Sequence, residues 1–183
     1  MVALILTAEL LFRSVRELSR ERAEDLLAPV RLMLREADAE TPERAAALLA
    51  QVAHESCGLT VCVEQETGQA YEGRHDLGNI RHGDGPRYRG RGWIQLTGRA
   101  NYRAAGLALG LPLEAVPELA AQVEVAARVA AWYWRTHDCN AAADRGDLEA
   151  VTRAINGGLN GLAERRARWA HARTALGLSE VAG

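Results

Sequence analysis

Glu55 and Glu64, in the segment VAHESCGLTVCVEQET at residues 52–67, are of the residue type that acid–base catalysis uses. Glu55 continues the apolar helical stripe that contains Leu48 and Val52, so we expect its side chain to be partly buried. It also falls in the predicted last turn of its helix, where the negative end of the helix dipole disfavours a charged carboxylate. Both effects favour a carboxyl group that keeps its proton and can donate it near neutral pH.

Glu64 follows nine residues later, in a polar insert close to an arginine-rich segment, where we expect it to be ionised. One carboxyl group held neutral and one kept charged is the pairing that glycoside hydrolysis requires. Two glutamates at a helix–strand junction can equally belong to a charged surface. The spacing of Glu55 and Glu64 therefore leaves both interpretations open.

Other chemistry in this segment is less well supported by the sequence. His54 lacks the second histidine four residues on that zinc proteases use, and His54 and Cys57 on one helical turn point in different directions. We therefore expect neither a metal nor a cofactor. The chain has three cysteines, Cys57, Cys62 and Cys139, an odd number that predicts buried free thiols and no disulfide framework.

Length and composition indicate one globular domain. The chain has 183 residues, of which 48% are hydrophobic and 25% charged, and its net charge of −2 argues against a nucleic-acid binder. No stretch reaches the roughly 18 apolar residues of a membrane span, and the N-terminus lacks the basic region of a signal peptide. We expect a monomer made in the cytoplasm that reaches an extracytoplasmic target with a helper protein of the holin type.

Basic residues are concentrated between residues 74 and 103. This segment contains Arg74, Arg81, Arg87, Arg89, Arg91, Arg99 and Arg103 but only two acids, Asp76 and Asp84. A basic, glycine-rich segment beside two carboxylates suits a polar or polyanionic polymer substrate. The arginines can equally pair with acids of the domain itself.

The pattern of apolar residues and breakers predicts a mainly α-helical α+β fold with a small strand and loop insert. Thr7, Thr41-Pro42 and Asp147 are helix starts, and Gly58 is a helix stop. The predicted helices cover residues 8–19, 21–38, 42–57, 98–109, 123–137, 147–155 and a final segment to 176. Between 59 and 97 the glycines separate short segments, among which TVCVEQ and WIQLT are the best strand candidates.

Four motifs together resemble the family 19 glycoside hydrolases, and most of all their short phage and prophage endolysin branch. The motifs are AHES with a second glutamate nine residues on, YEGRHDLGN, GDGPRYRGRGWIQLTGRANYRAAG and VTRAINGGLNGLAERRARW. The match runs from about residue 41 to 176, behind N-terminal helices in residues 1–40. The resemblance implies that residues 1–183 form a single lysozyme-like, two-lobed domain that cleaves β-1,4 bonds next to N-acetylated sugars with inversion.

The resemblance also implies catalytic roles. Glu55 becomes the general acid that protonates the leaving oxygen, Glu64 the general base that activates water, and Thr97 the residue that holds this water. Inversion requires space for the water, so the two carboxyl groups are expected roughly 6.5–9.5 Å apart.

The substrate-binding residues implied by the resemblance are Gln95, Asn101, Asn156, Tyr88, Trp93 and Arg165. Asn156 can alternatively cap the turn that the following glycines form. Tyr88 and Trp93 are candidates for a sugar platform, and Trp93 is equally a candidate for the core. Arg165 corresponds to an arginine that supports the second catalytic glutamate, here Glu64, or else is a solvated residue of the last helix.

The leading hypothesis from the sequence is a peptidoglycan-degrading endolysin. A chitinase that acts on N-acetylglucosamine polymers is the alternative within the same chemistry. A catalytically inactive wall-binding module is a more distant alternative, which the presence of Glu55, Glu64 and Thr97 disfavours.

Overall fold

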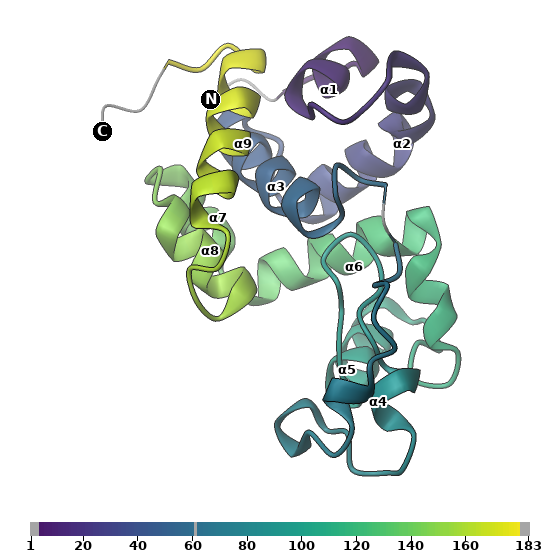
Figure 1. The fold of residues 1–183 in the computed structure, drawn as a ribbon. Coiled ribbons are helices and arrows are strands. Elements are labelled where there is room, and N and C mark those ends of the chain that lie inside the picture. The colour runs from purple at the N-terminus through teal and green to yellow at the C-terminus, as the bar shows by residue number, and fades with distance from the viewer. Residues whose placement is uncertain (1–3, 61, 180–183) are drawn as a thin grey trace.

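The structure is a computed structural model that describes residues 4–60 and 62–179. Helices account for most of this part of the chain (Figure 1). The α-helices are α1 (Ala8–Ser14), α2 (Arg20–Glu36), α3 (Pro42–Glu55), α4 (Asp84–Arg87), α5 (Arg99–Leu109), α6 (Val123–Thr136), α7 (Cys139–Asp144), α8 (Leu148–Asn156) and α9 (Leu162–Ala175). Three short 3₁₀ helices are η1 (Gln69–Tyr71), η2 (His75–Leu77) and η3 (Pro117–Ala121).

The helices form two groups that α6 connects (Figure 1). The first group contains α1, α2, α3, α7, α8 and α9, with α3 packed along α9. The second group contains α4, α5 and the loops around them. Helix α6 contacts α2 of the first group and α5 of the second, so its position fixes how the two groups face each other.

Helix α3 is the central element of the first group. Thr41 caps it by accepting a hydrogen bond from the Arg44 backbone N–H at 3.3 Å, and Pro42 occupies the first turn. Every residue from Ala45 to Ala53 is buried. Five of these nine residues are alanines, whose small side chains let α7, α8 and α9 approach α3 closely. The helix that ends at Glu55 is therefore held on several sides.

The mainly helical fold class is confirmed, and most predicted helices are found within two residues of their expected bounds. The first helix ends at Ser14, five residues earlier than predicted, because Val15 has an extended backbone. The prediction of two strands is wrong within the described residues. TVCVEQ and WIQLT contribute only isolated bridges, Val63 to Arg91 and Arg91 to Leu96, and residue 61 lies outside the described residues. Gly92 and Gln95 both have left-handed backbones, which interrupt an extended strand.

The three cysteines are free, and their environments differ. Cys139 is buried, and burial raises the pKa of its thiol to about 12. Cys62 is half-buried, and burial also raises the pKa of its thiol. Cys57 is exposed, with a left-handed φ of 49°, so the prediction of a buried thiol is wrong at this position, although its neighbours Ser56 and Gly58 are buried. None of the helices described is long and apolar enough to cross a membrane.

Candidate active site

Glu55, at the end of α3, is held by a buried network of hydrogen bonds. Its Oε1 atom accepts from the Arg165 guanidinium of α9 in an ion pair, and the Arg165 side chain is only 2% exposed. A second guanidinium nitrogen of Arg165 donates to Gln51 Oε1, and Gln51 Nε2 donates to Thr152 Oγ1 of α8 at 3.0 Å. Side chains from three helices thus fix the position of the Glu55 carboxylate.

The expectation that Arg165 supports Glu64 or contacts substrate is wrong. Arg165 is buried and pairs with Glu55, because α9 packs along α3 and not along the segment that carries Glu64. The sequence argument about Glu55 considered only burial and the helix dipole. The structure adds the positive charge of the Arg165 guanidinium beside this carboxyl group. A positive charge at this position stabilises the carboxylate that remains after an acid has given up its proton.

His54 packs beside Glu55 against the start of α9. A Cβ atom on Gly161 would lie 2.6 Å from two atoms of the His54 ring, so only glycine allows this contact. Burial, followed by the nearby Arg165 charge, lowers the pKa of His54, which favours a neutral ring. Across residues 4–60 and 62–179, no group of three His, Cys, Asp or Glu side chains is arranged to hold a metal ion.

Glu64 is anchored in the second group of elements. Its backbone N–H donates to the Gly90 carbonyl at 3.0 Å, and the Tyr71 hydroxyl donates to its Oε2 atom at 3.1 Å. Burial, together with the Glu64 charge, raises the pKa of Tyr71, which keeps this hydroxyl protonated as a donor. The Oε1 atom of Glu64 is buried and has no hydrogen-bond partner among the described residues. The lone pairs of this oxygen are therefore not used by any protein donor among these residues.

Sequence reasoning did not identify Tyr71 or Gln51 as site residues. Tyr71 is the first residue of the YEGRHDLGN motif, so the motif itself was the available signal. Gln51 lies four residues before Glu55 on α3, a spacing that places both side chains on one helix face. A polar residue in an otherwise alanine-rich buried helix was the signal that could have identified Gln51.

Gly90 brings Glu64 and Gln95 to one place. A Cβ atom on Gly90 would lie 2.7 Å from Gln95 Oε1 and 2.9 Å from Glu64 Oε2. The absence of a side chain at Gly90 therefore makes room for both polar groups. Gln95 has a left-handed φ of 53°, an uncommon conformation for a residue other than glycine, which is often found at functional sites.

Thr97 and Asn101 extend this cluster through a chain of hydrogen bonds. The Thr97 hydroxyl donates to the Gln95 carbonyl at 2.8 Å, and Asn101 Nδ2 donates to the Thr97 carbonyl at 2.8 Å. Because its hydrogen is used in this way, the Thr97 oxygen has lone pairs free to accept a hydrogen bond. Hydrogen bonds thus link Gln95, Thr97 and Asn101, and Gln95 lies near Glu64 across Gly90. Their roles in catalysis and sugar binding stay predictions.

The proposed sugar platform is wrong. Tyr88 is 1% exposed and Trp93 is fully buried, so neither can present a ring face to a sugar. Both are large aromatic side chains that belong to the hydrophobic core of the domain. Asn156 ends α8 and donates from Nδ2 to the Asn160 carbonyl at 3.4 Å, which is consistent with its alternative role in a turn. A contact of Asn156 with sugar remains a prediction.

Most arginines of the basic segment pair within the protein. This agrees with the interpretation that they pair with acids of the domain itself. Arg74 pairs with Asp76 at 2.6 Å, Arg103 pairs with Glu114 at 2.8 Å, and Arg99 contacts both Asp84 and Glu114. Arg91 is 5% exposed and donates to the backbone carbonyl of residue 87 at 2.8 Å. The segment is therefore less basic at its surface than its composition predicts.

Comparison with known proteins identifies the family. The sequence profile of the family described as Chitinase class I matches residues 34–145, more than half of the chain. The chain belongs to the family 19 glycoside hydrolases. A family 19 domain-containing protein from Haemophilus influenzae is 45% identical over 96 residues, which cover 52% of this chain and 46% of that protein. An endochitinase from Arabidopsis thaliana is 39% identical over 116 residues, covering 62% of this chain and 38% of the relative.

The chain thus spans less than half the length of these curated relatives. Solved structures support the fold over a greater length. Chitinase C from Streptomyces griseus aligns with a TM-score of 0.78 and 23% identity, over 100% of this chain and 98% of that one. A second bacterial family 19 chitinase aligns with a TM-score of 0.77 and 24% identity, over 97% of each chain. The lysozyme-like fold expected of family 19 is therefore confirmed.

Proposed function

We propose that this family 19 protein hydrolyses β-1,4 glycosidic bonds next to N-acetylated sugars, with Glu55 as the acid and Glu64 as the base. The observation that carries the proposal is the separate anchoring of two carboxylates. Glu55 is held by Arg165 between helices of the first group, and Glu64 by Tyr71 and the Gly90 carbonyl in the second group. Two carboxyl groups fixed on different elements can act on opposite sides of one sugar.

In the proposed reaction, Glu55 donates its proton to the glycosidic oxygen as the bond to the anomeric carbon breaks. The Arg165 guanidinium then stabilises the carboxylate that remains. Glu64 takes a proton from water as the water oxygen bonds to the anomeric carbon on the opposite face. The Thr97 oxygen accepts a hydrogen bond from this water. The mechanism keeps the prediction that the carboxyl groups stand roughly 6.5–9.5 Å apart.

For the substrate, we propose the glycan strand of peptidoglycan. Support comes from the resemblance of the motifs to the phage and prophage endolysin branch of family 19. Chitin is the second candidate, favoured by the relatives from Streptomyces griseus and Arabidopsis thaliana that are named chitinases. Both polymers present N-acetylated sugars joined by β-1,4 bonds, so the same pair of carboxyl groups serves either one.

The test compares both polymers with the parent chain and with E55Q. Purified peptidoglycan and chitin oligomers are incubated separately, and new reducing ends are identified by mass spectrometry. We expect the parent chain to release them from peptidoglycan and E55Q to release none while still binding. The control is E24Q, since Glu24 is exposed on α2, and it should behave as the parent. Release only from chitin would refute the peptidoglycan assignment, and full activity of E55Q would refute the acid assignment.

A further inference from the structure

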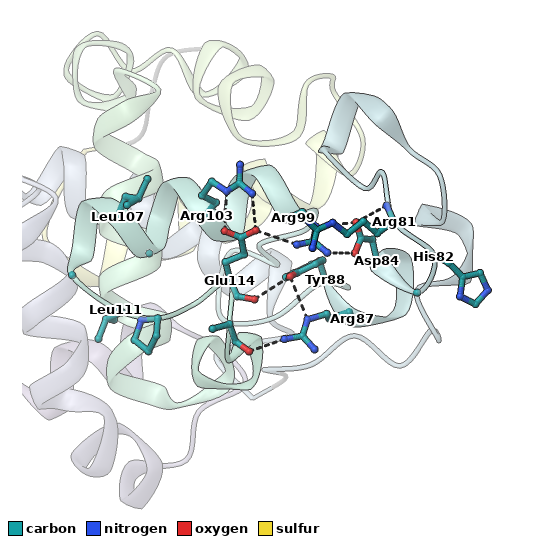
Figure 2. A pocket seen from close by; sticks show the side chains of 15 residues that line it. Arg81, His82, Asp84, Arg87, Tyr88, Arg99, Arg103, Leu107, Leu111 and Glu114 are labelled. Atoms are coloured by element: carbon teal, nitrogen blue, oxygen red, sulfur yellow. Dashed lines mark hydrogen bonds and ion pairs between the residues drawn. The ribbon is translucent and has the colours of Figure 1, made fainter.

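A polar hollow lies in the second group of elements, lined by neither catalytic candidate (Figure 2). It has a volume of about 780 Å³ and lies between α4, α5 and the chain that follows α5. Its lining contains four arginines, two acids and one histidine, which are Arg81, Arg87, Arg99, Arg103, Asp84, Glu114 and His82. We call it the arginine hollow. The proposed reaction uses none of these residues.

Both acids of the arginine hollow are already neutralised by arginines. Asp84 is 1% exposed and accepts from Arg99 Nε at 2.9 Å, and this bond lowers the pKa of Asp84. Glu114 accepts from Arg103 at 2.8 Å and from Arg99 Nη1 at 3.1 Å (Figure 2). These bonds lower the pKa of Glu114 to about 2, and the bond from Arg103 has the largest effect. Both acids are therefore charged at neutral pH and occupied by Arg99 and Arg103.

The remaining charge of the arginine hollow is positive, since four arginines face two acids. Arg87 and Arg103 each donate hydrogen bonds through Nε and Nη2. The third guanidinium nitrogen of each, Nη1, has no protein partner among the described residues. The Arg81 side chain is exposed at the rim. These three guanidinium groups are available to bind a carboxylate or another anion.

One end of the arginine hollow is apolar. Leu107 is 80% exposed, and Leu111 and Pro112 lie beside it in the lining. Leu107 follows Arg103 by four residues on α5, so the two side chains share one helix face and the basic and apolar parts adjoin (Figure 2). The arginine hollow therefore suits a ligand with an acidic group attached to a short aliphatic body.

We propose that the arginine hollow binds the carboxylate-bearing peptide attached to the wall glycan. This inference rests on the proposed function, because peptidoglycan carries short peptides with free carboxylates and alanine side chains, whereas chitin is uncharged. Tyr88 lines the arginine hollow, and its carbonyl accepts from Gly98 N at 2.8 Å, directly after Thr97. The arginine hollow is therefore built on the same group of elements as the residues around Glu64.

The test measures binding of a free acidic wall peptide, alanine–glutamate–diamino acid–alanine, to the full chain by isothermal titration calorimetry. The same peptide with all its carboxyl groups amidated and inorganic phosphate are the comparison ligands. We expect the acidic peptide to bind and the amidated one to bind about tenfold more weakly or not at all. The variant R81Q/R103Q should lose at least about tenfold in affinity. Glu114 keeps its contact with Arg99 in this variant, and the urea midpoint of the variant, measured beside that of the parent, checks that it is folded.

The control R35Q removes one exposed arginine from α2, far along the chain from the arginine hollow, and should bind the peptide as the parent does. Equal binding of the two peptides, or of the parent and R81Q/R103Q, would overturn the proposal. So would inorganic phosphate that binds as tightly as the peptide, since that marks a general anion site. Calorimetry measures only binding of the peptide, so it tests the arginine hollow alone. Failure of the proposed hydrolysis would appear in the other assay, as the absence of new reducing ends with the parent chain.

Discussion

Replacing Gly90 with alanine tests whether the position of the Glu64 carboxylate matters for activity. The added Cβ would lie 2.7 Å from Gln95 Oε1 and 2.9 Å from Glu64 Oε2. Both atoms are at the far ends of flexible side chains, so the close contacts can be relieved by rotating these side chains away. To regain ordinary contact each oxygen has to move by roughly 0.5–1 Å. The substitution therefore displaces the predicted base while the backbone stays in place.

The expected effects on stability and activity differ greatly in size. Gly90 has no left-handed φ, so alanine fits its backbone and reduces the entropy of the unfolded chain, which stabilises by about 0.4–1 kcal/mol. Side chains turned away from their preferred rotamers cost about 0.5–1.5 kcal/mol, so the free energy of unfolding should change by less than about 1 kcal/mol. A misplacement of about 1 Å in a catalytic group can reduce the rate about 100-fold.

The assay is kcat on the cleaved glycan oligomer, measured beside the urea-induced unfolding of the same preparation. The control is G158A, because a Cβ at Gly158 meets no atom within 4 Å and this residue also lacks a left-handed φ. We expect G90A to lose about 100-fold in kcat and G158A to keep it. Full activity of G90A would refute the role of Glu64. A loss of several kcal/mol in stability would refute the argument that the contacts are relieved by side-chain rotation.

Three further predictions follow from the same contacts. R165M leaves Glu55 without its buried partner and should lower the free energy of unfolding in urea by about 3 kcal/mol, and an unchanged midpoint would contradict this. Y71F removes the hydrogen bond to Glu64 and should reduce kcat about tenfold while lowering the free energy of unfolding by only about 1 kcal/mol; a parent-like rate would show that this bond is dispensable. Glu114 has its pKa lowered from 4.5 to about 2, so its stabilisation is present above pH 4.5 and lost as the pH falls towards 2. The stability difference between parent and E114Q should shrink by about 1–2 kcal/mol over that range, and a constant difference would refute the linkage.

The helical part of the fold could be predicted from the sequence because its signals are local. Thr41 and Pro42 mark a helix start through a side-chain acceptor and a fixed φ, and the structure places α3 there. The glycine-rich segment was less predictable. Its path depends on left-handed residues such as Gln95, whose side chain gives no sequence signal for that conformation. Two alternating segments consequently resembled strands but form only isolated bridges.

The candidate site shows the same division between local and long-range information. The grouping of Gln95, Thr97 and Asn101 follows from their closeness in sequence. The partner of Arg165 does not, because it lies 110 residues away and depends on which helix α9 packs against. The burial of Trp93 also required the fold, since an aromatic residue in a loop suits a platform or a core equally well.

The stereochemistry of the first product tests the two-carboxylate account most directly. A β-linked oligomer cleaved by the parent chain can be followed by proton NMR within the first minutes, before the anomers equilibrate. An acid and a base acting on opposite faces of the sugar predict that the new reducing end appears first as the α-anomer. If the β-anomer appears first, Glu64 does not activate water in the way proposed, and the central claim is contradicted.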